Sequence, residues 1–190
     1  MNISLISDIK TKYMGKNIQY YKEIDSTHTY AKNKYNELKN GEVIITDKQT
    51  SGIGTKGRSW YTGTGKNIAI TIMIKPKFTI SMISELTVKI AQSIKKSIYE
   101  LYNYNLQIKE PNDLILNNKK IGGILTEVHT LGENIKYLII SIGFNVNEEE
   151  FCKETEMIAT SLKKEFNKEF SREVIIKKIL EDLEEVIEKI

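Results

Sequence analysis

Strand-like apolar segments follow one another directly between residues 106 and 142, and this order is the feature that most constrains the fold. The segments are 106–109, 114–116, 121–128 and 135–142. They are short and rich in β-branched side chains, and Asn117-Asn118 predicts a tight hairpin turn between the second and the third. Strict alternation of strands with helices, which parallel α/β folds need, is absent from this pattern. The segments therefore predict mainly antiparallel pairing.

Two amphipathic helices are expected on either side of these strands. Isoleucines and leucines recur every three or four residues over 83–101 and again over 172–190. Asp25-Ser26-Thr27 is a cluster of helix-capping residue types, and a polar, helix-compatible stretch follows it. Shorter elements are expected at 28–39 (helix), 43–45 (strand) and 67–75 (strand).

The composition is that of a globular protein. Of 190 residues, 40% are hydrophobic and 28% are charged, and no apolar run is long enough to span a membrane. The single cysteine excludes a disulfide framework and a cysteine-cluster metal site, and a net charge of +3 is too small to argue for nucleic acid. We predict a single cytoplasmic domain over 1–190, with neither nucleic acid nor membrane as partner. Its predicted class is α+β, a mixed, largely antiparallel sheet with helices packed on one face.

A glycine-rich segment at residues 49–66 contains five glycines and is expected to be a loop. Gly52–Gly57 matches G-x-G-x-x-G, but no helix follows and no acidic residue lies about twenty positions on, so the dinucleotide-binding interpretation fails. Kinase and Walker motifs fail as well, because their partner residues are missing. Amides in such turns bind anions, and Lys56 and Arg58 add positive charge. The segment therefore suggests a phosphate site, and it also fits a flexible surface loop.

Arginine is scarce in this chain, which makes each arginine informative. There are 26 lysines and only two arginines, Arg58 and Arg172. Arg58 lies in the glycine-rich segment, where a guanidinium can bind phosphate through two donors. Trp60, the only tryptophan, lies two residues later and is suited either to stack on a base or to anchor the loop.

Six motifs, in order along the chain, resemble those of biotin protein ligases. Residues 49–60 (QTSGIGTKGRSW) resemble the family's loop for biotin and adenylate, and 109–113 (KEPND) resemble its K-W-P-N-D segment. The others are 25–27 (DST), 119–127 (KKIGGILTE), 143–147 (GFNVN) and 159–162 (ATSL). The resemblance extends from about residue 20 to the end of the chain. Its strength lies in the joint order of the motifs.

The resemblance implies a ligation in two steps with ATP, Mg²⁺ and biotin. Biotin's carboxylate would attack the α-phosphate of ATP, giving biotinyl-5′-AMP and pyrophosphate. A lysine of a biotin carboxyl carrier domain would then attack the mixed anhydride and release AMP. The first step needs positive charge rather than a base, and Lys120, Arg58 and Lys109 would supply it. The second step needs an acceptor for the amine's proton, for which Asp113 is the candidate.

The resemblance also implies binding roles for further residues. Biotin would be bound by Ser26, Thr27, Gln49, Gly52 and Gly123, with Gly52 allowing close approach of the backbone. ATP would be bound by Lys56, Arg58, Trp60, Asn112 and Asn145, with Asn112 also a candidate contact to the metal. Several of these residue types have simpler structural uses, because Ser26 and Thr27 suit a helix cap and asparagines suit turns.

Four residues depart from the family pattern. Ile53 and Thr55 replace arginines that help order the loop, Glu110 replaces a tryptophan, and His28 stands where asparagine is common. We expect weaker retention of the adenylate, or phosphate contacts from Lys56 instead. The family's N-terminal winged helix and small C-terminal β-barrel are also expected to be missing, and with them an operator-binding role. A homodimer, common among relatives, is left open.

Two other functions stay open. A lipoate–protein ligase or related acyl-adenylate transferase shares the fold, but it lacks the G-x-x-G-R-x-W pattern found at Gly54–Trp60. A degenerate protein that binds biotin or biotinyl-AMP without transferring it is suggested by Ile53, Thr55 and Glu110. Against that degenerate protein, the chain contains Lys120, Arg58, Asn112 and Asp113 at the motif positions.

Overall fold

The computed structural model describes residues 1–63, 65–83 and 85–190. Its centre is a seven-stranded sheet with the order β1-β2-β3-β7-β6-β5-β4. β1 and β2 pair in parallel, and the other neighbouring strands pair antiparallel. The strands are β1 (Ile18–Tyr21), β2 (Glu42–Thr46), β3 (Ile68–Ile74), β4 (Gln107–Lys109), β5 (Asp113–Leu116), β6 (Lys119–Leu131) and β7 (Asn134–Phe144).

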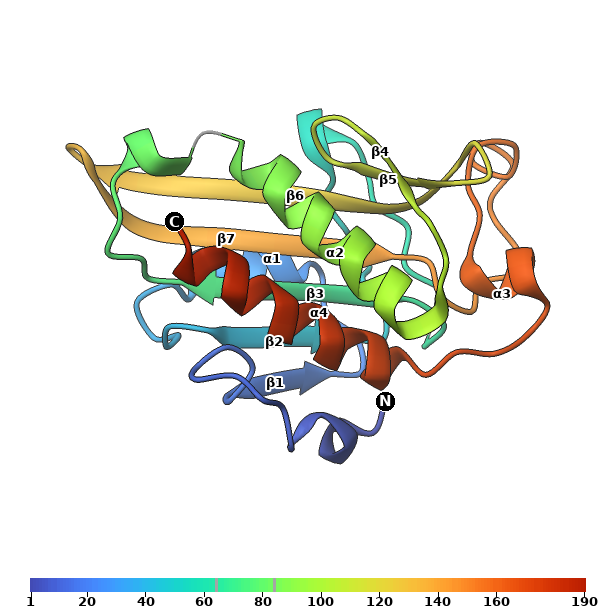
Figure 1. Cartoon of the computed structure of the whole chain (residues 1–190), viewed down its shortest axis with the longest axis horizontal. Coiled ribbons are helices and arrows are strands. Elements are labelled where there is room, and N and C mark those ends of the chain that lie inside the picture. Colours follow the sequence, from blue (N-terminus) through green and yellow to red (C-terminus); the bar gives the residue numbers. More distant parts are fainter. Residues whose placement is uncertain (64, 84) are drawn as a thin grey trace.

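Two long helices lie side by side across one face of the sheet, in front of it in Figure 1. The helices are α1 (Thr27–Asn33), α2 (Leu86–Tyr102), α3 (Leu162–Phe166) and α4 (Arg172–Glu188), with single 3₁₀ turns η1 (Ile3–Ile6), η2 (Thr55–Gly57) and η3 (Ile80–Ile83). None of the helices in the described ranges combines the length and the apolar character that a bilayer crossing requires.

Side chains along the central strands alternate between the two faces of the sheet. Ile72 and Ile140 belong to the main core with the isoleucines and leucines of α2 and α4. Met73 and Ile139, their neighbours, form a smaller cluster with Ala31 of α1. All seven residues of β3 are buried, so apolar residues occupy both of its faces and Thr71 is the single polar residue among the seven.

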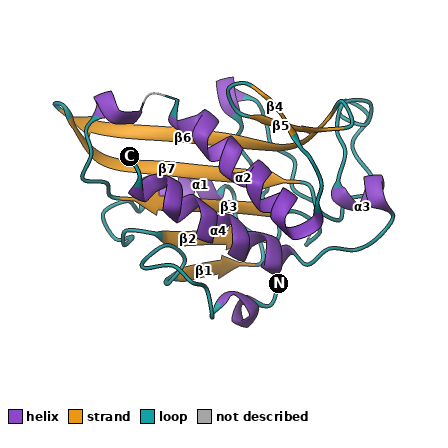
Figure 2. Ribbon diagram, in the orientation of Figure 1, coloured by secondary structure: helices purple, strands orange, loops and turns teal. Residues whose placement is uncertain are grey.

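The short helix α1 covers only part of its face, behind the sheet in Figure 2. Farther along the same face the strand residues, apart from Leu125, are small or polar: Ala69, Thr71, Gly123, Ser141 and Gly143. The predicted fold class is confirmed, including the long helix pair on one face, while α1 occupies the opposite face. The strand face that α1 leaves uncovered is where the cleft described below lies.

Most predicted elements are confirmed with shifted ends. Asn117 and Asn118 have φ of 48° and 64°, as a tight hairpin turn of this kind requires. The first helix ends at Asn33 rather than near residue 39, and the helix predicted from Ile83 begins at Leu86. Residues 64 and 84, inside the predicted loop and helix, lie outside the described residues. β1 and α3 were not predicted, because four and five residues are too few to establish a period.

Candidate active site

A cleft of about 650 Å³ opens on the face of the sheet that carries α1. Strands β3, β6 and β7 form its floor, and its walls are the glycine-rich loop, the β4–β5 hairpin and the segment 151–159. The predicted site residues that line it are Thr27, Gln49, Arg58, Trp60, Lys109, Asn112, Asp113, Lys120, Gly123 and Asn145. The fold therefore brings most of the predicted site together around one cavity.

Three predicted site residues lie outside the lining. Ser26 is buried and caps α1, because its Oγ accepts a hydrogen bond from the Thr29 N–H at 3.3 Å. Gly52 packs within the loop, where a Cβ would overlap the Trp60 carbonyl oxygen. Lys56 is exposed at a left-handed position with a φ of 57°. These positions have structural uses of their own, and direct contact of Ser26, Gly52 and Lys56 with a ligand stays a prediction.

Lys120 is the central cation of the cleft. Its Nζ donates a hydrogen bond to Asp113 Oδ1 at 2.6 Å, and Asn112 Nδ2 donates to the same oxygen at 3.2 Å. The hairpin of β5 and β6 places Asp113 and Lys120 together across its turn. The Lys120 Nζ also lies 5.6 Å from the centre of the Trp60 ring, within the range of a cation–π contact. An ammonium group held in this way can meet an anionic ligand by changing partners.

Trp60 lies against a flat patch formed by two glycines. Gly123 of β6 and Gly143 of β7 are direct partners in the sheet. A Cβ on Gly143 would overlap the indole at Cε2, and a Cβ on Gly123 would lie 3.2 Å from Trp60 Cζ3. The missing side chains therefore make the room that the indole occupies.

The glycine-rich loop is folded back on itself. The Gly54 N–H donates to the Arg58 carbonyl oxygen at 2.6 Å, and the Trp60 N–H donates to the Gly52 carbonyl oxygen at 2.8 Å. The exposed Arg58 guanidinium also binds the loop itself. Its Nε donates to the Thr55 carbonyl oxygen and its Nη2 to Thr55 Oγ1, both at 3.3 Å. The loop is thus held by its own backbone, with the guanidinium at the rim of the cleft.

The structure also places the four departures from the family pattern. Thr55 provides the oxygens that hold Arg58, and Ile53 is an apolar part of the lining. Glu110 is exposed and lies outside the lining, so its carboxylate does not face the cleft. His28 is 6% exposed and lies in the floor.

Five side chains form a polar row at the floor of the cleft, and all of them except the fully buried Thr71 line the cavity: Gln49, Thr27, Thr71, Ser141 and His28. Gln49 Oε1 accepts hydrogen bonds from the Thr27 N–H at 2.9 Å and the Thr27 hydroxyl at 3.1 Å. Thr71 Oγ1 lies 2.8 Å from both Thr27 Oγ1 and Ser141 Oγ, and His28 Nδ1 lies 2.9 Å from Ser141 Oγ. Each member has a neighbour in the row, as buried polar groups require.

The other nitrogen of His28 faces a carboxylate. Nε2 lies 3.1 Å from Glu127 Oε2, and Lys32 Nζ lies 2.9 Å from Glu127 Oε1. Burial by itself would raise the pKa of Glu127, but the hydrogen bonds from Lys32 and His28 outweigh burial and leave that pKa below its ordinary value. Glu127 is therefore ionised at neutral pH and acts as a hydrogen-bond acceptor.

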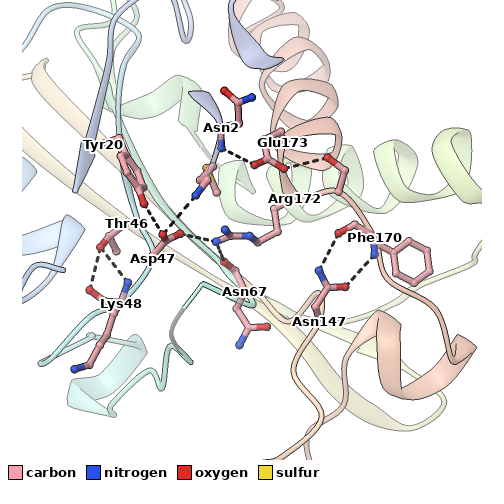
Figure 3. Close-up of polar contacts among 12 residues, drawn as sticks. Asn2, Tyr20, Thr46, Asp47, Lys48, Asn67, Asn147, Phe170, Arg172 and Glu173 are labelled. Carbon is pink, nitrogen blue, oxygen red and sulfur yellow. Dashed lines mark hydrogen bonds and ion pairs between the residues drawn. The ribbon is translucent and has the colours of Figure 1, made fainter. Parts of the chain in front are cut away.

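Arg172, at the start of α4, holds both ends of the stretch that contains the glycine-rich loop (Figure 3). Its Nη1 donates to Asp47 Oδ1 at 2.8 Å and to the Asn67 carbonyl oxygen at 3.2 Å. Burial would raise the pKa of Asp47, but hydrogen bonds from the Tyr20 hydroxyl and Arg172 outweigh burial and lower it. One buried guanidinium thus connects the chain before the loop with the chain after it.

The side chains of the two asparagines in the 143–147 motif form hydrogen bonds with backbone groups of other segments. Asn145 Nδ2 donates to the Thr160 carbonyl oxygen at 3.0 Å. Asn147 exchanges hydrogen bonds of 2.9 and 3.0 Å with the backbone of Phe170, as Figure 3 shows. Asn145 lines the cleft as well, so its amide serves both the fold and the cavity.

Sequence reasoning missed several residues of the site. Thr71 and Ser141 each interrupt an apolar run in a strand, and a polar residue at such a buried position is a usable signal. Gly143 belongs to a quoted motif, but its contact with Trp60 depends on the pairing of β6 with β7. Arg172 was noticed only for the scarcity of arginine, since its partners lie more than a hundred residues away.

Comparison with known proteins identifies the relatives of this chain. Residues 20–145 match the model of the biotin/lipoate A/B protein ligase family. The bifunctional ligase/repressor BirA of Bacillus subtilis is 33% identical over 90% of this chain and 54% of its own length. The biotin--[acetyl-CoA-carboxylase] ligase of Paracoccus denitrificans is 28% identical over 64% of this chain and 51% of its own length. The chain thus spans about half the length of these curated relatives.

A solved structure agrees with the observed fold. The biotin protein ligase of Aquifex aeolicus, in complex with biotin and ATP, superposes with a TM-score of 0.81 at 28% identity. The match covers 92% of this chain and 71% of that one. The fold therefore has a counterpart in a protein whose structure contains biotin and ATP.

Proposed function

The chain belongs to the biotin/lipoate A/B protein ligase family, and from that premise we propose that it activates biotin with ATP and transfers the biotinyl group to a protein lysine. The acceptor proposed is a biotin carboxyl carrier domain, in keeping with the acetyl-CoA-carboxylase ligase among its relatives. The proposal depends chiefly on one observation. Lys120, Asp113 and Trp60 lie around the same cleft as Arg58 of the glycine-rich loop.

In the first step, a biotin carboxylate oxygen bonds to the α-phosphorus of ATP. The bond from that phosphorus to the bridging oxygen breaks, and pyrophosphate leaves. Both reactants are anions, so the reaction needs preorganised positive charge rather than a base. Lys120 supplies that charge from the floor, with Arg58 and Lys109 at the rim.

In the second step, the acceptor amine attacks the acyl carbon of biotinyl-AMP and AMP leaves. The amine must lose a proton, and Asp113 is the proposed acceptor. In the structure Asp113 Oδ1 is occupied by Lys120 and Asn112. When Lys120 turns to a phosphate, it releases that oxygen for the amine.

Mg²⁺ belongs to this proposal as part of the MgATP substrate. Within the described residues, no group of three or more histidine, cysteine, aspartate or glutamate side chains is placed to hold a metal. Mg²⁺ at nucleotide sites is bound largely by phosphates and water, with one or two protein oxygens. Asn112 lines the cleft beside Lys120 and is the proposed protein contact.

The test is pyrophosphate exchange into MgATP with biotin, with lipoate or with neither. We expect exchange that depends on biotin, and a loss of at least about a hundredfold in Lys120→Ala, because one preorganised cationic contact to the reacting phosphate disappears. Lys119→Ala is the matched control, since Lys119 is the adjacent lysine of β6 and lies outside the lining. Its exchange rate should stay within about twofold of wild type.

Other outcomes would replace the proposal. Exchange that depends on lipoate would assign a lipoate ligase. Biotin binding by calorimetry without exchange would indicate a binding protein without ligase activity. Undiminished exchange in Lys120→Ala would refute the role given to Lys120.

A further inference from the structure

Segment 158–162, which contains the ATSL motif, lies directly beside Lys120, although the proposed reaction makes no use of it. β7 is paired with β6 back to Gly122, and at Lys120 this segment takes the place of β7. The Lys120 N–H donates to the Ile158 carbonyl oxygen at 2.7 Å, and the Lys120 carbonyl oxygen accepts from the Thr160 N–H at 2.9 Å. Both backbone polar groups of Lys120 therefore depend on this one segment.

The β5–β6 hairpin lies on the other side of Lys120. Its turn is Asn117-Asn118, and β5 pairs Ile115 with Lys120. The same hairpin carries Asp113, which accepts the hydrogen bond from the Lys120 ammonium at 2.6 Å. The position of the ammonium in the cleft thus depends on how the hairpin and segment 158–162 are held relative to each other.

Glu165 of α3 connects these two parts of the chain. Asn117 Nδ2 donates to Glu165 Oε2, and Thr160 Oγ1 donates to Glu165 Oε1. Each carboxylate oxygen therefore binds one of the two segments that flank Lys120. Both donors are neutral groups, an amide and a hydroxyl, so the connection depends on hydrogen-bond geometry and does not need a second charge.

The helix that carries Glu165 is held in place by other contacts. Ser161 Oγ caps α3 by accepting a hydrogen bond from the Lys164 N–H at 3.0 Å, and Leu162 is fully buried. The Leu162 N–H also lies 3.3 Å from the Asn145 carbonyl oxygen, to which it donates. Removal of the Glu165 carboxylate should therefore leave α3 in place and open only the connection between the two segments.

We propose that Glu165 is a positioning residue for Lys120. By joining the hairpin turn to Thr160, its carboxylate fixes the backbone of Lys120 and with it the place of the ammonium in the cleft. The inference rests on the proposed function, in which Lys120 meets the anionic reactants. Glu165 itself lies outside the cleft lining, but a shift of about 1 Å at a reacting group can lower a rate by up to about a hundredfold.

The first measurement is amide hydrogen exchange, followed by NMR on the full chain without ligand. In Glu165→Ala we expect the amide hydrogens of Lys120 and Thr160 to exchange at least about tenfold faster than in wild type, because their hydrogen bonds open locally. The Val43 amide, which donates to the Asn17 carbonyl oxygen near the other edge of the sheet, should keep its rate. Unchanged rates at Lys120 and Thr160 would overturn the inference.

Three further variants separate the hydrogen bonds from the charge of Glu165. Glu165→Gln should behave nearly as wild type, since its oxygen still accepts from Thr160 and its amide can donate to Asn117 Oδ1 once that side chain turns. Asn117→Gly should act in the same direction as Glu165→Ala, and its φ of 48° suits glycine. Glu169→Ala is the matched control, because it removes an equal charge from an exposed glutamate that pairs with Lys163. A Glu165→Gln variant as impaired as Glu165→Ala would contradict the inference.

Kinetics then test whether Glu165 acts through Lys120. In Glu165→Ala the kcat for biotin-dependent formation of biotinyl-AMP should fall about tenfold, with the KM values for biotin and ATP within about threefold of wild type. In a Lys120→Ala background, measured in single turnovers, the same change should cost less than about twofold, because the group that is positioned is gone. An equal loss in both backgrounds would assign Glu165 a general structural role and overturn the inference.

The proposed function and this inference can fail separately. If wild type forms no biotinyl-AMP, the proposed function fails, and amide hydrogen exchange still decides whether Glu165 holds the backbone of Lys120. If wild type is active and the Lys120 and Thr160 amides exchange at the same rate in Glu165→Ala, only the inference fails.

Discussion

The indole of Trp60 fits in its position because two neighbouring residues are glycines. Gly123 and Gly143 are paired across the central strands, and the indole lies against them. The same indole is 5.6 Å from Lys120 Nζ. A larger residue at either glycine should therefore displace Trp60 and alter its contact with Lys120.

We predict that Gly143→Ala displaces Trp60 into solvent. Its new Cβ would overlap the indole, and overpacking of this kind costs about 1–3 kcal/mol. Because Trp60 is the only tryptophan, its emission should shift to longer wavelength, and biotin affinity should fall by roughly tenfold or more. Fluorescence, urea unfolding and calorimetry measure the three effects.

Gly123→Ala provides the graded comparison. Its Cβ would lie 3.2 Å from Trp60 Cζ3, a tight contact that a small shift relieves. The spectral shift and the loss of stability should be smaller than in Gly143→Ala. Identical emission spectra for both variants and wild type would contradict the contact described here.

At the scale of elements, Arg172 connects the first turn of α4 to the ends of β2 and β3. Its two partners, the Asp47 carboxylate and the Asn67 carbonyl oxygen, lie before and after the stretch that contains the glycine-rich loop. The helix therefore stabilises the loop from the opposite end of the sequence.

We predict that Arg172→Met lowers the free energy of unfolding by about 3 kcal/mol at pH 7, because the buried Asp47 carboxylate loses its nearer cation and keeps only the N-terminal ammonium, 3.5 Å away. In wild type the pKa of Asp47 is lowered, so the pair stabilises the fold above the ordinary value of 3.8 and loses that effect as pH falls through the lowered pKa. Without Arg172 that pKa is lowered less, because only the Tyr20 hydroxyl and the N-terminal ammonium still favour the carboxylate. The difference from wild type should therefore shrink as pH falls below 3.8 and through the lowered wild-type pKa, as measured by urea unfolding.

Lys177→Met is the control on the same helix. Lys177 pairs with the exposed Asp8, and a surface ion pair contributes at most about 1 kcal/mol. The double variant Arg172→Met/Asp47→Asn should recover part of the stability, because a neutral amide replaces the carboxylate that has lost its nearer cation. A difference between Arg172→Met and wild type that does not vary with pH would argue against the ion pair as its source.

At the scale of the whole molecule, the main apolar core and the cleft lie on opposite faces of the sheet. The α2 and α4 face holds the main apolar core, and the opposite face holds the cleft beyond α1. The β3, β6 and β7 strands contribute to both faces through alternate residues. A ligand bound in the cleft therefore stabilises the same strands that form the core.

We predict that biotin raises the melting temperature. At a hundred times its Kd, a ligand that binds only the folded state adds about 2.7 kcal/mol. For a chain of this size that corresponds to roughly 5–10 °C. Thermal unfolding with biotin, and with lipoate at equal concentration, tests this, and a larger shift with lipoate would contradict the proposed specificity.

The sequence by itself determined the types of most elements, the hairpin at Asn117-Asn118, the family, and ten residues of the cleft lining. These features depend on local periodicity, turn chemistry or ordered motifs, all of which are readable along the chain. The first helix was placed correctly at its start, because Ser26 is a local cap, and its end was overextended, because tertiary packing decides where a polar helix stops.

Only the tertiary structure decided the polar row, the Trp60 patch and the connection through Arg172. Thr27, Thr71 and Ser141 come from three elements, and their hydrogen bonds form only when these elements pack together. Gly143 matters to Trp60 through strand pairing, and Arg172 reaches Asp47 across 125 positions. Such contacts join distant parts of the chain and leave no periodic pattern, so the fold had to be known before their chemistry could be derived.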